Sequence, residues 1–262
     1  MRGWLVATMA AVALLGCTND DSTQGATLPT APATVTVAST TPAATDAPAT
    51  SAASTSVIAT TTSTTTTAPA TMAPGVVGLS PDGPWHLVDS APGITTPGLV
   101  YELMPKLWAF IQVEETDTST YSWTLNEADR PIIEAYLQAQ LTYYTAVTSN
   151  PIDLDLPGWT EFYTDGGATR YEDLRLKADQ GQRVDMDLGV VFRPQVLGDE
   201  RTDSEAIVSD CVLDGGVFRM PDGSLAEGSI VGVTPYDWGA RLRKIDGRWI
   251  VVQEGAVVGS CS

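Results

Sequence analysis

The sequence predicts an α+β domain whose helices pack on a curved, mostly antiparallel sheet, preceded by a disordered tether. A long helical period covers residues 124–149, and strand patterns fill the chain from 184 onward. Ahead of both, residues 17–75 are rich in Thr, Ala, Ser and Pro. Because helices precede strands instead of alternating with them, we expect the helices to be segregated to one face of the sheet.

Residues 1–16 have the pattern of a lipoprotein signal peptide. Arg2 is followed by an apolar run over 4–15, which is shorter than the roughly 20 residues of a membrane-spanning helix. The run ends in Leu14-Leu15-Gly16-Cys17, which resembles the lipid-attachment box of bacterial lipoproteins. We therefore expect an extracytoplasmic protein anchored in the cell membrane through acyl chains on Cys17. An ordinary signal peptide that ends near a chance cysteine is the alternative.

The segment 17–75 is predicted to be the tether between this anchor and the domain. It offers few large apolar side chains to offset the entropy of backbone ordering, so we expect it to be disordered.

The formal net charge of −18 excludes one class of partner. Every basic residue except Arg2 lies from Lys106 onward, and acidic residues outnumber them. A nucleic-acid-binding protein needs a basic surface, which this chain lacks. The same acidity argues against a domain that lies flat on anionic headgroups.

Cysteine counting predicts one disulfide. The chain has Cys17, Cys211 and Cys261, so acylation of Cys17 leaves an even pair in an exported protein. A Cys211–Cys261 bond would close a loop of about 50 residues, for which the chain-entropy model gives ~4 kcal/mol. Two unpaired core cysteines are the alternative. With His86 as the single histidine, we expect no metal site and no cofactor.

Residues 76–123 are predicted to be a strand-rich N-terminal extension. Five prolines break any long helix, and strands are expected over 99–104, 108–113 and 121–123. An extra strand layer across the domain is the expected arrangement.

The long helix has apolar residues on one face and a predicted capping box at its start. Thr124 and Glu127 have the spacing of such a box. Pro131 fits only if regular helix begins near Asp129 or if the first turn is kinked. The helix should end by Asn150, because a proline follows it.

Shorter elements follow in a regular order. Helical turns are expected over 156–163 and 171–178, and the alternation over 184–193 predicts one long strand. A further strand is expected over 206–213. Asp246-Gly247 is the strongest hairpin signal of the chain, between strands 238–245 and 248–254.

These features resemble the nuclear transport factor 2-like superfamily, the ketosteroid-isomerase-like cone. The helix 124–149, the aromatic turn near 159–163, the strand 184–196 and the last hairpin carry the resemblance, which implies a cone domain over 124–262. The cysteine pair is also similar to that of lipoprotein members of this superfamily. Dehydratase-type members rely on histidines, and this region has none, so the resemblance implies no catalytic residue.

Carboxylates and aromatic side chains are the candidate site residues. On one predicted strand, Asp185 and Asp187 share a face, where burial could raise one pKa for acid–base work. Asp210 on the next strand is a similar candidate, and a solvated outer face is the alternative for all three. Aromatic residues expected to line a cone cavity, or else to fill the core, are Tyr136, Tyr144, Trp159 and Trp249.

Three functions remain open from the sequence. The first is binding of a small apolar ligand or an envelope protein without catalysis. The second is a structural or assembly module of an envelope complex, including a homodimer through the open sheet. The third is a cone-type isomerase or dehydratase-like enzyme on a small apolar substrate.

Overall fold

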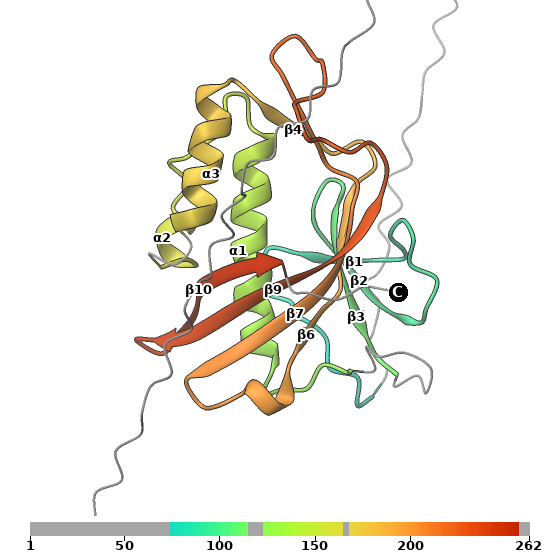
Figure 1. Ribbon diagram of the computed structural model, residues 1–262. Helices are drawn as coiled ribbons and strands as arrows, with labels where there is room; N and C mark the ends of the chain where they lie inside the picture. The colour runs from blue at the N-terminus through green and yellow to red at the C-terminus, as the bar shows by residue number, and fades with distance from the viewer. Residues whose placement is uncertain (1–73, 115–122, 165–167, 257–262) are drawn as a thin grey trace, which may run out of the picture. The chain divides into compact units, whose positions relative to one another are not determined.

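The computed structural model describes residues 74–114, 123–164 and 168–256 (Figure 1). The predicted signal peptide and nearly all of the predicted tether, with Cys17, lie outside the described residues, as does Cys261. Among the helices that are described, none combines the length and apolarity needed to cross a membrane.

The described elements follow the predicted order of helices before most strands. The helices are α1 (Arg130–Thr148), α2 (Gly158–Glu161), α3 (Ala168–Asp179) and the 3-10 turn η2 (Gly198–Glu200). The strands are β1 (His86–Val88), β2 (Gly98–Met104), β3 (Leu107–Gln112), β4 (Arg183–Asp185), β5 (Val190–Phe192), β6 (Pro194–Val196), β7 (Glu205–Asp214), β8 (Val217–Arg219), β9 (Thr234–Ile245) and β10 (Arg248–Ala256).

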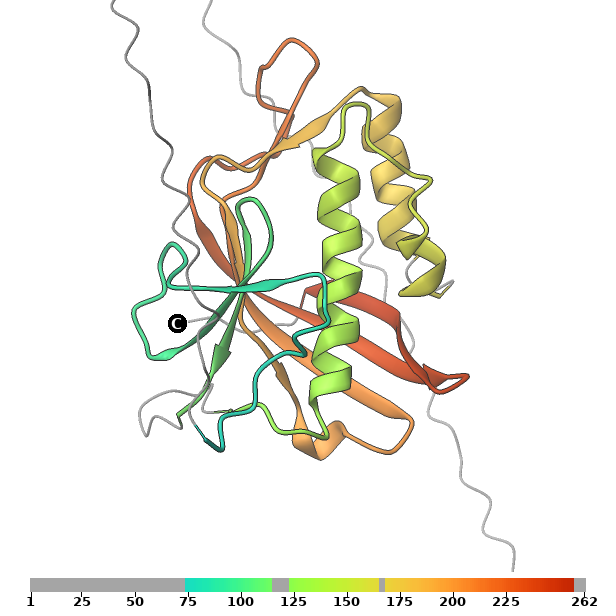
Figure 2. The ribbon, with the colours of Figure 1, turned by 180° about the vertical axis from the view of Figure 1, so that it is seen from behind.

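One large sheet carries the domain, in the order β1-β2-β3-β5-β7-β9-β10, with β6 also paired to β7. Every pairing is antiparallel except β3 with β5. A separate two-stranded sheet pairs β4 with β8. The sheet curves around α1, and α3 lies beside α1 in both views (Figures 1 and 2). The predicted α+β class, with helices on a curved, mostly antiparallel sheet, is confirmed.

The main core lies between α1 and the sheet. Ile132, Ile133 and Leu137 of α1 are completely buried, and so are Val208 of β7 and Leu242 of β9. These side chains belong to one continuous apolar cluster. Their spacing on the helix is the predicted apolar face.

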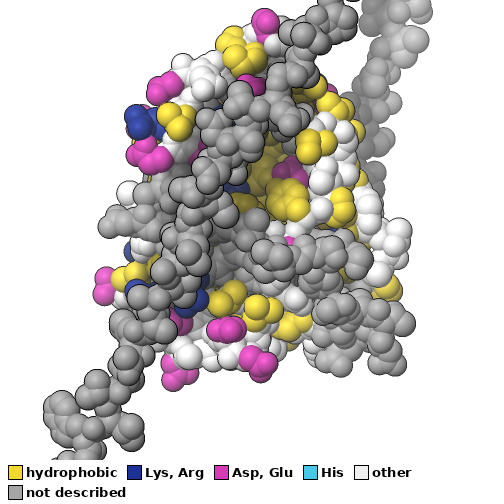
Figure 3. Space-filling model, in the orientation of Figure 1, with side chains coloured by type: hydrophobic (Ala, Val, Ile, Leu, Met, Phe, Trp, Pro, Cys, Tyr) yellow, Lys and Arg dark blue, Asp and Glu magenta, His cyan; other side chains and the backbone are white. Residues whose placement is uncertain are grey.

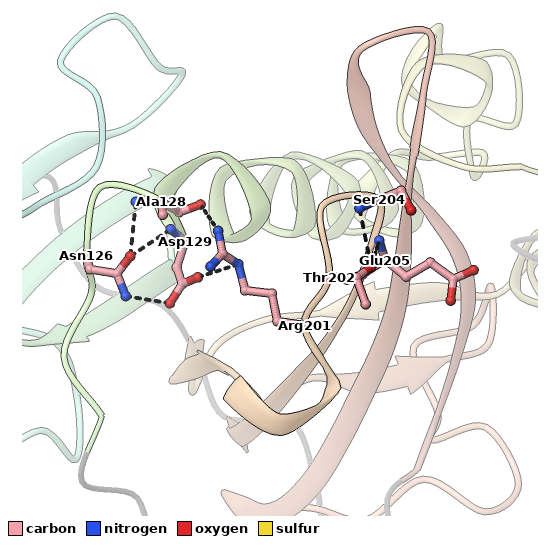
Figure 4. Close-up of polar contacts among 7 residues, drawn as sticks. All are labelled: Asn126, Ala128, Asp129, Arg201, Thr202, Ser204 and Glu205. Carbon is pink, nitrogen blue, oxygen red and sulfur yellow. Dashed lines mark hydrogen bonds and ion pairs between the residues drawn. The ribbon is translucent and has the colours of Figure 1, made fainter.

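The predicted capping box is wrong, because the helix begins later than Thr124. The residue before its first turn is Asp129, as the proline at 131 required, and its side chain makes no capping hydrogen bond. Instead, the Asn126 side-chain oxygen accepts hydrogen bonds from the backbone N–H groups of Ala128 and Asp129, both at 3.0 Å (Figure 4). Arg201 Nε lies 2.9 Å from Asp129 Oδ1 and ties the loop before β7 to this end of the helix. That loop is itself closed by Thr202, whose hydroxyl accepts the backbone N–H of Glu205 at 2.9 Å.

The long strand expected over 184–193 is also wrong. The chain leaves β4 in a turn and resumes as β5 after Gly189, whose φ of +73° lies in the left-handed region. A Cβ on Gly189 would lie 2.4 Å from the ring of Trp108, so the turn needs glycine for space as well as for φ. Apolar residues continue to alternate along the sequence through the turn, so the sequence pattern does not reveal the break.

The N-terminal strands extend the same sheet and do not form the separate layer that the sequence suggested. Strand β3 runs parallel to β5, and Trp108 is the register partner of Val191. On the opposite face of the sheet from α1, a second small cluster contains Ala91, Val100 and Phe110. Of the strand expected over 121–123, the first two residues lie outside the described residues, and residue 123 is not in a strand.

The final hairpin is as predicted. Its turn residues Asp246 and Gly247 have φ values of +49° and +80°, which suit the tight turn that matches strand twist. The hairpin places the end of β10 beside α1, where the candidate site lies.

Candidate functional site

A cavity of about 470 Å³ opens between α1, α3 and the strands β7 to β10. In the view of Figure 3, hydrophobic side chains gather in this region with acidic and basic ones among them. Aromatic rings dominate the wall, and a few charged groups interrupt them. The lining residues are Gln140, Tyr143, Tyr144, Arg170, Asp173, Phe192, Val212, Asp214, Phe218, Tyr236, Trp238, Glu254 and Gly255.

A buried ion pair forms one wall of the cavity. Arg170 Nη1 donates to Glu254 Oε2 at 2.7 Å, and the two side chains are 14% and 3% exposed. Gln140 of α1 joins them, accepting from Arg170 at 3.1 Å and donating to Glu254. Helix α1, helix α3 and strand β10 therefore meet in one closed hydrogen-bonded network.

The guanidinium of Arg170 is also enclosed by aromatic rings. It lies 3.4 Å from the ring centroid of Tyr143 and 5.1 Å from that of Trp238. Burial is the largest effect and would lower the pKa of Arg170, but the carboxylate of Glu254 and the neighbouring tyrosines, Tyr143 among them, together raise that pKa well above its usual value. The arginine is thus a fixed, neutralised part of the wall.

A carboxylate, that of Asp214 at the end of β7, lies among tyrosines. Its Oδ2 accepts a hydrogen bond from Tyr236 at 2.8 Å and a longer one from Tyr144 at 3.4 Å. Its Oδ1 accepts the backbone N–H of Gly216 at 2.7 Å. Burial, followed by the charge of Asp214, raises the pKa of Tyr236, so this hydroxyl stays protonated and keeps donating. Three donors therefore hold the carboxylate in place.

A smaller cavity of about 370 Å³ adjoins the first. Both are lined by Asp214, Phe218 and Tyr236, so the carboxylate stands where they meet. The loop between β8 and β9 forms the far side, and its Ile230 is 68% exposed. One side of the smaller cavity is thus formed by a loop that carries an exposed isoleucine.

Beneath the cavity, Asp210 and Tyr136 form a sealed polar pair. The Tyr136 hydroxyl donates to Asp210 Oδ2 at 2.9 Å, and the backbone N–H of Arg193 donates to Oδ1 at 2.6 Å. Both residues are completely buried. Burial raises the pKa of Asp210 to about 7, against the opposing effect of the two hydrogen bonds. Neither residue lines the cavity, so neither can touch a ligand in it.

Of the four aromatic residues that the sequence proposed for the cavity, one lines it. Tyr144 lines the cavity, while Tyr136 lies below it in the core. Trp159 is buried beside α1, and Trp249 is a partly buried residue at the edge of the core. Neither tryptophan is on the cavity wall.

The two aspartates proposed as a pair lie elsewhere. Asp185 is ion-paired with Arg219 at 2.6 Å, and the hydrogen bond from that arginine lowers its pKa. Asp187 is in the turn after β4, 78% exposed, and ion-paired with Lys106 at 2.6 Å. Because the strand breaks between them, they share no face, and neither lines the cavity.

Two other residues from the sequence also lie away from the cavity. His86 is at the start of β1 and contacts Glu102 at 3.0 Å. Cys211 is buried on β7. Its proposed partner Cys261 lies outside the described residues, so the disulfide remains a prediction.

Sequence reasoning missed the charged residues of the cavity. Arg170 and Glu254 are 84 residues apart, and no local pattern links them. The sequence did contain an indication for Asp214. It is followed by Gly215 and Gly216, which predict a tight turn and so place the carboxylate at the end of a strand. Arg170 is the first basic residue after Arg130, which made it a cation in an otherwise acidic and neutral stretch.

No protein-family model matches the chain, and no curated protein matches it significantly. Several solved structures are similar in part. The intermembrane space region of the chloroplast protein ARC6 is 10% identical over 52% of this chain and 100% of its own, with a TM-score of 0.40. The association domain of C. elegans CaMKII is 15% identical over 49% of this chain and 97% of its own length, with a TM-score of 0.32. An NTF-2 like protein of unknown function from Shewanella oneidensis MR-1 is 11% identical over 48% of this chain and 96% of its own length, with a TM-score of 0.29. These values are too low to assign a family or an activity.

Proposed function

We propose that this chain is a lipid-anchored extracytoplasmic protein whose cone-like domain binds a small, mostly apolar ligand without transforming it. The observation that carries the proposal is the aromatic cavity of about 470 Å³, a size within the range of ligand sites. Its few polar groups are held by hydrogen bonds and ion pairs, as expected for groups that orient a ligand. Helices packed on a curved, mostly antiparallel sheet also support placing the domain among nuclear transport factor 2-like proteins.

Binding without catalysis fits the state of the acidic groups. The carboxyl group with a pKa near neutrality, Asp210, is sealed below the cavity. On the wall, Glu254 is neutralised by Arg170 and Asp173 is ion-paired with Lys177. The third wall carboxylate, Asp214, accepts hydrogen bonds from Tyr236, Tyr144 and the backbone N–H of Gly216. A general base needs to reach a substrate proton, and these groups are either out of reach or occupied.

Native mass spectrometry of the full chain, purified from its own membrane, tests the proposal. We expect an added mass that disappears on denaturation. Phe218→Ala should weaken retention of this ligand about tenfold, because Phe218 lines both cavities and its ring supplies apolar contact. Leu225→Ala is the matched control, because that side chain is 42% exposed and lies outside both cavities. A bare chain mass would contradict ligand binding, and equal retention in both variants would contradict this cavity as the binding site.

A second candidate is an assembly module, favoured by the exposed loop before β9. Ile230, Val231 and Val233 are 68%, 67% and 50% exposed, which is unusual for large apolar side chains grouped in one loop. The same spectra distinguish this function, since it predicts multiples of the chain mass or a bound protein in place of a small added mass.

Membrane attachment is tested separately at Cys17. We expect the wild-type protein to fractionate with membranes and to incorporate labelled fatty acid, since acyl chains on one cysteine give stable anchoring. Cys17→Ser should abolish labelling and leave the precursor unprocessed or soluble. Wild-type protein that carries no label would reject the lipoprotein assignment while leaving the cavity proposal intact.

A further inference from the structure

The charges on the cavity wall do not balance. Four charged side chains line the larger cavity, namely Asp173, Asp214, Glu254 and Arg170. Glu254 is paired with Arg170, and Asp173 is paired with Lys177 of the same helix. Among the described residues, none places a cationic group within ion-pair distance of Asp214, whose hydrogen bonds come from neutral donors. The cavity therefore holds one carboxylate without a counter-ion.

The surrounding rings add to this preference for positive charge. Tyrosine, tryptophan and phenylalanine faces attract cations, and the attraction grows where water is excluded. In this protein the same rings already hold cations: Arg170 lies over Tyr143 and Trp238, and Lys177 Nζ lies 4.9 Å from the ring centroid of Phe218. The ring of Tyr236 lies next to the carboxylate of Asp214, because the Tyr236 hydroxyl donates a hydrogen bond to it.

We propose that the ligand is an organic cation, an amine or quaternary ammonium with an apolar substituent, whose charge lies against Asp214. This inference rests on the proposed function, because it names the class of ligand that the same cavity takes. The ammonium group would sit where the two cavities meet, and the apolar part would contact Phe192, Val212 and Phe218. An anionic ligand is disfavoured by the same carboxylates and by the net charge of −18.

Three probes of similar size separate charge from shape. Benzyltrimethylammonium is the cation, neopentylbenzene is its neutral isostere, and phenylacetate is the anion. We would measure binding of each to the full chain by ligand-observed NMR. The cation should bind at least tenfold more tightly than the isostere, and the anion should not bind measurably.

The variant Asp214→Asn then tests the assigned counter-ion. It keeps the side-chain shape and an acceptor for Gly216, and it should remove the preference of the cation over the isostere. Asp199→Asn makes the same charge change at an exposed site and should leave the preference unchanged. The wild-type comparison remains decisive even if Asp214→Asn does not fold.

The outcomes are distinguishable. If the cation binds no more tightly than the neutral isostere, the cation inference is wrong, and ligand binding itself remains possible for this cavity. A preference that persists in Asp214→Asn would overturn the role of this carboxylate. If no probe binds and no native ligand is found by mass spectrometry, the ligand-binding function and this inference fall together.

Discussion

Glu254→Gln is expected to lower the free energy of unfolding by about 3 kcal/mol, because it leaves Arg170 charged and largely buried. The carboxylate is 3% exposed and also receives the Gln140 side chain, so its loss weakens both contacts that join α1, α3 and β10. We place the effect at the lower end of the range for broken buried pairs, because Arg170 lines the cavity and water there can solvate it in part. Urea denaturation monitored by tryptophan fluorescence measures the change.

A double-mutant cycle distinguishes the ion pair from general packing. In Glu254→Gln with Arg170→Met, neither charge remains, so the loss should be clearly smaller than the sum of the single losses. The surface pair of Lys106 and Asp187 is the matched control, with side chains 47% and 78% exposed. Asp187→Asn should cost no more than about 1 kcal/mol. Additive losses in the buried cycle would show that the pair is not coupled.

The second large effect is a pH dependence that arises from Asp210. Its carboxyl group has a pKa of about 7 in the folded protein, whereas an unfolded aspartate titrates near its usual value of 3.8. Between these values the unfolded chain has lost the proton and the folded chain keeps it, so stability falls as pH rises. The contribution is fully present below about pH 4 and is lost through pH 7, and its size is on the order of 4 kcal/mol.

Asp210→Asn removes this titration. The stability of the wild type relative to Asp210→Asn should therefore fall as pH rises from 4 to 8, with little further change above that. Comparing the two proteins at each pH cancels the titration of all other groups. Asp199→Asn changes an exposed carboxylate, so its free energy of unfolding should change with pH in the same way as that of the wild type. A flat difference between wild type and Asp210→Asn would mean that Asp210 is ionised in the folded state.

Local patterns in the sequence predicted the elements whose neighbours are close in the chain. The apolar face of α1 and the hairpin at Asp246-Gly247 follow from residues within one or two turns of each other, and both are present. The break at Gly189 was missed because alternation of apolar residues resumes in the same phase after the turn. The ring of Trp108 in β3 leaves no room for a Cβ at position 189, and no local pattern can reveal that distant contact.

The candidate site was harder to predict for the same reason. Tyr144 was found because it lies on the apolar face of the helix. Arg170 was not, because a charged residue in a polar helix normally faces solvent, and only its distant partner Glu254 explains its burial. Asp185 and Asp187 were selected on a strand geometry that the chain does not adopt.

The parallel pairing of β3 with β5 affects how the chain reaches its folded state. More than eighty residues, including all the helices of the domain that precede β5, separate Leu107 from its register partner Val190. The hairpin of β2 and β3 can form early, yet its outer edge must wait for a distant segment, and such high contact order slows folding. During synthesis that edge, with Phe110 and Ile111 beside it, is open to pairing with other chains. A chaperone that shields β3 would therefore be expected to increase the folded yield.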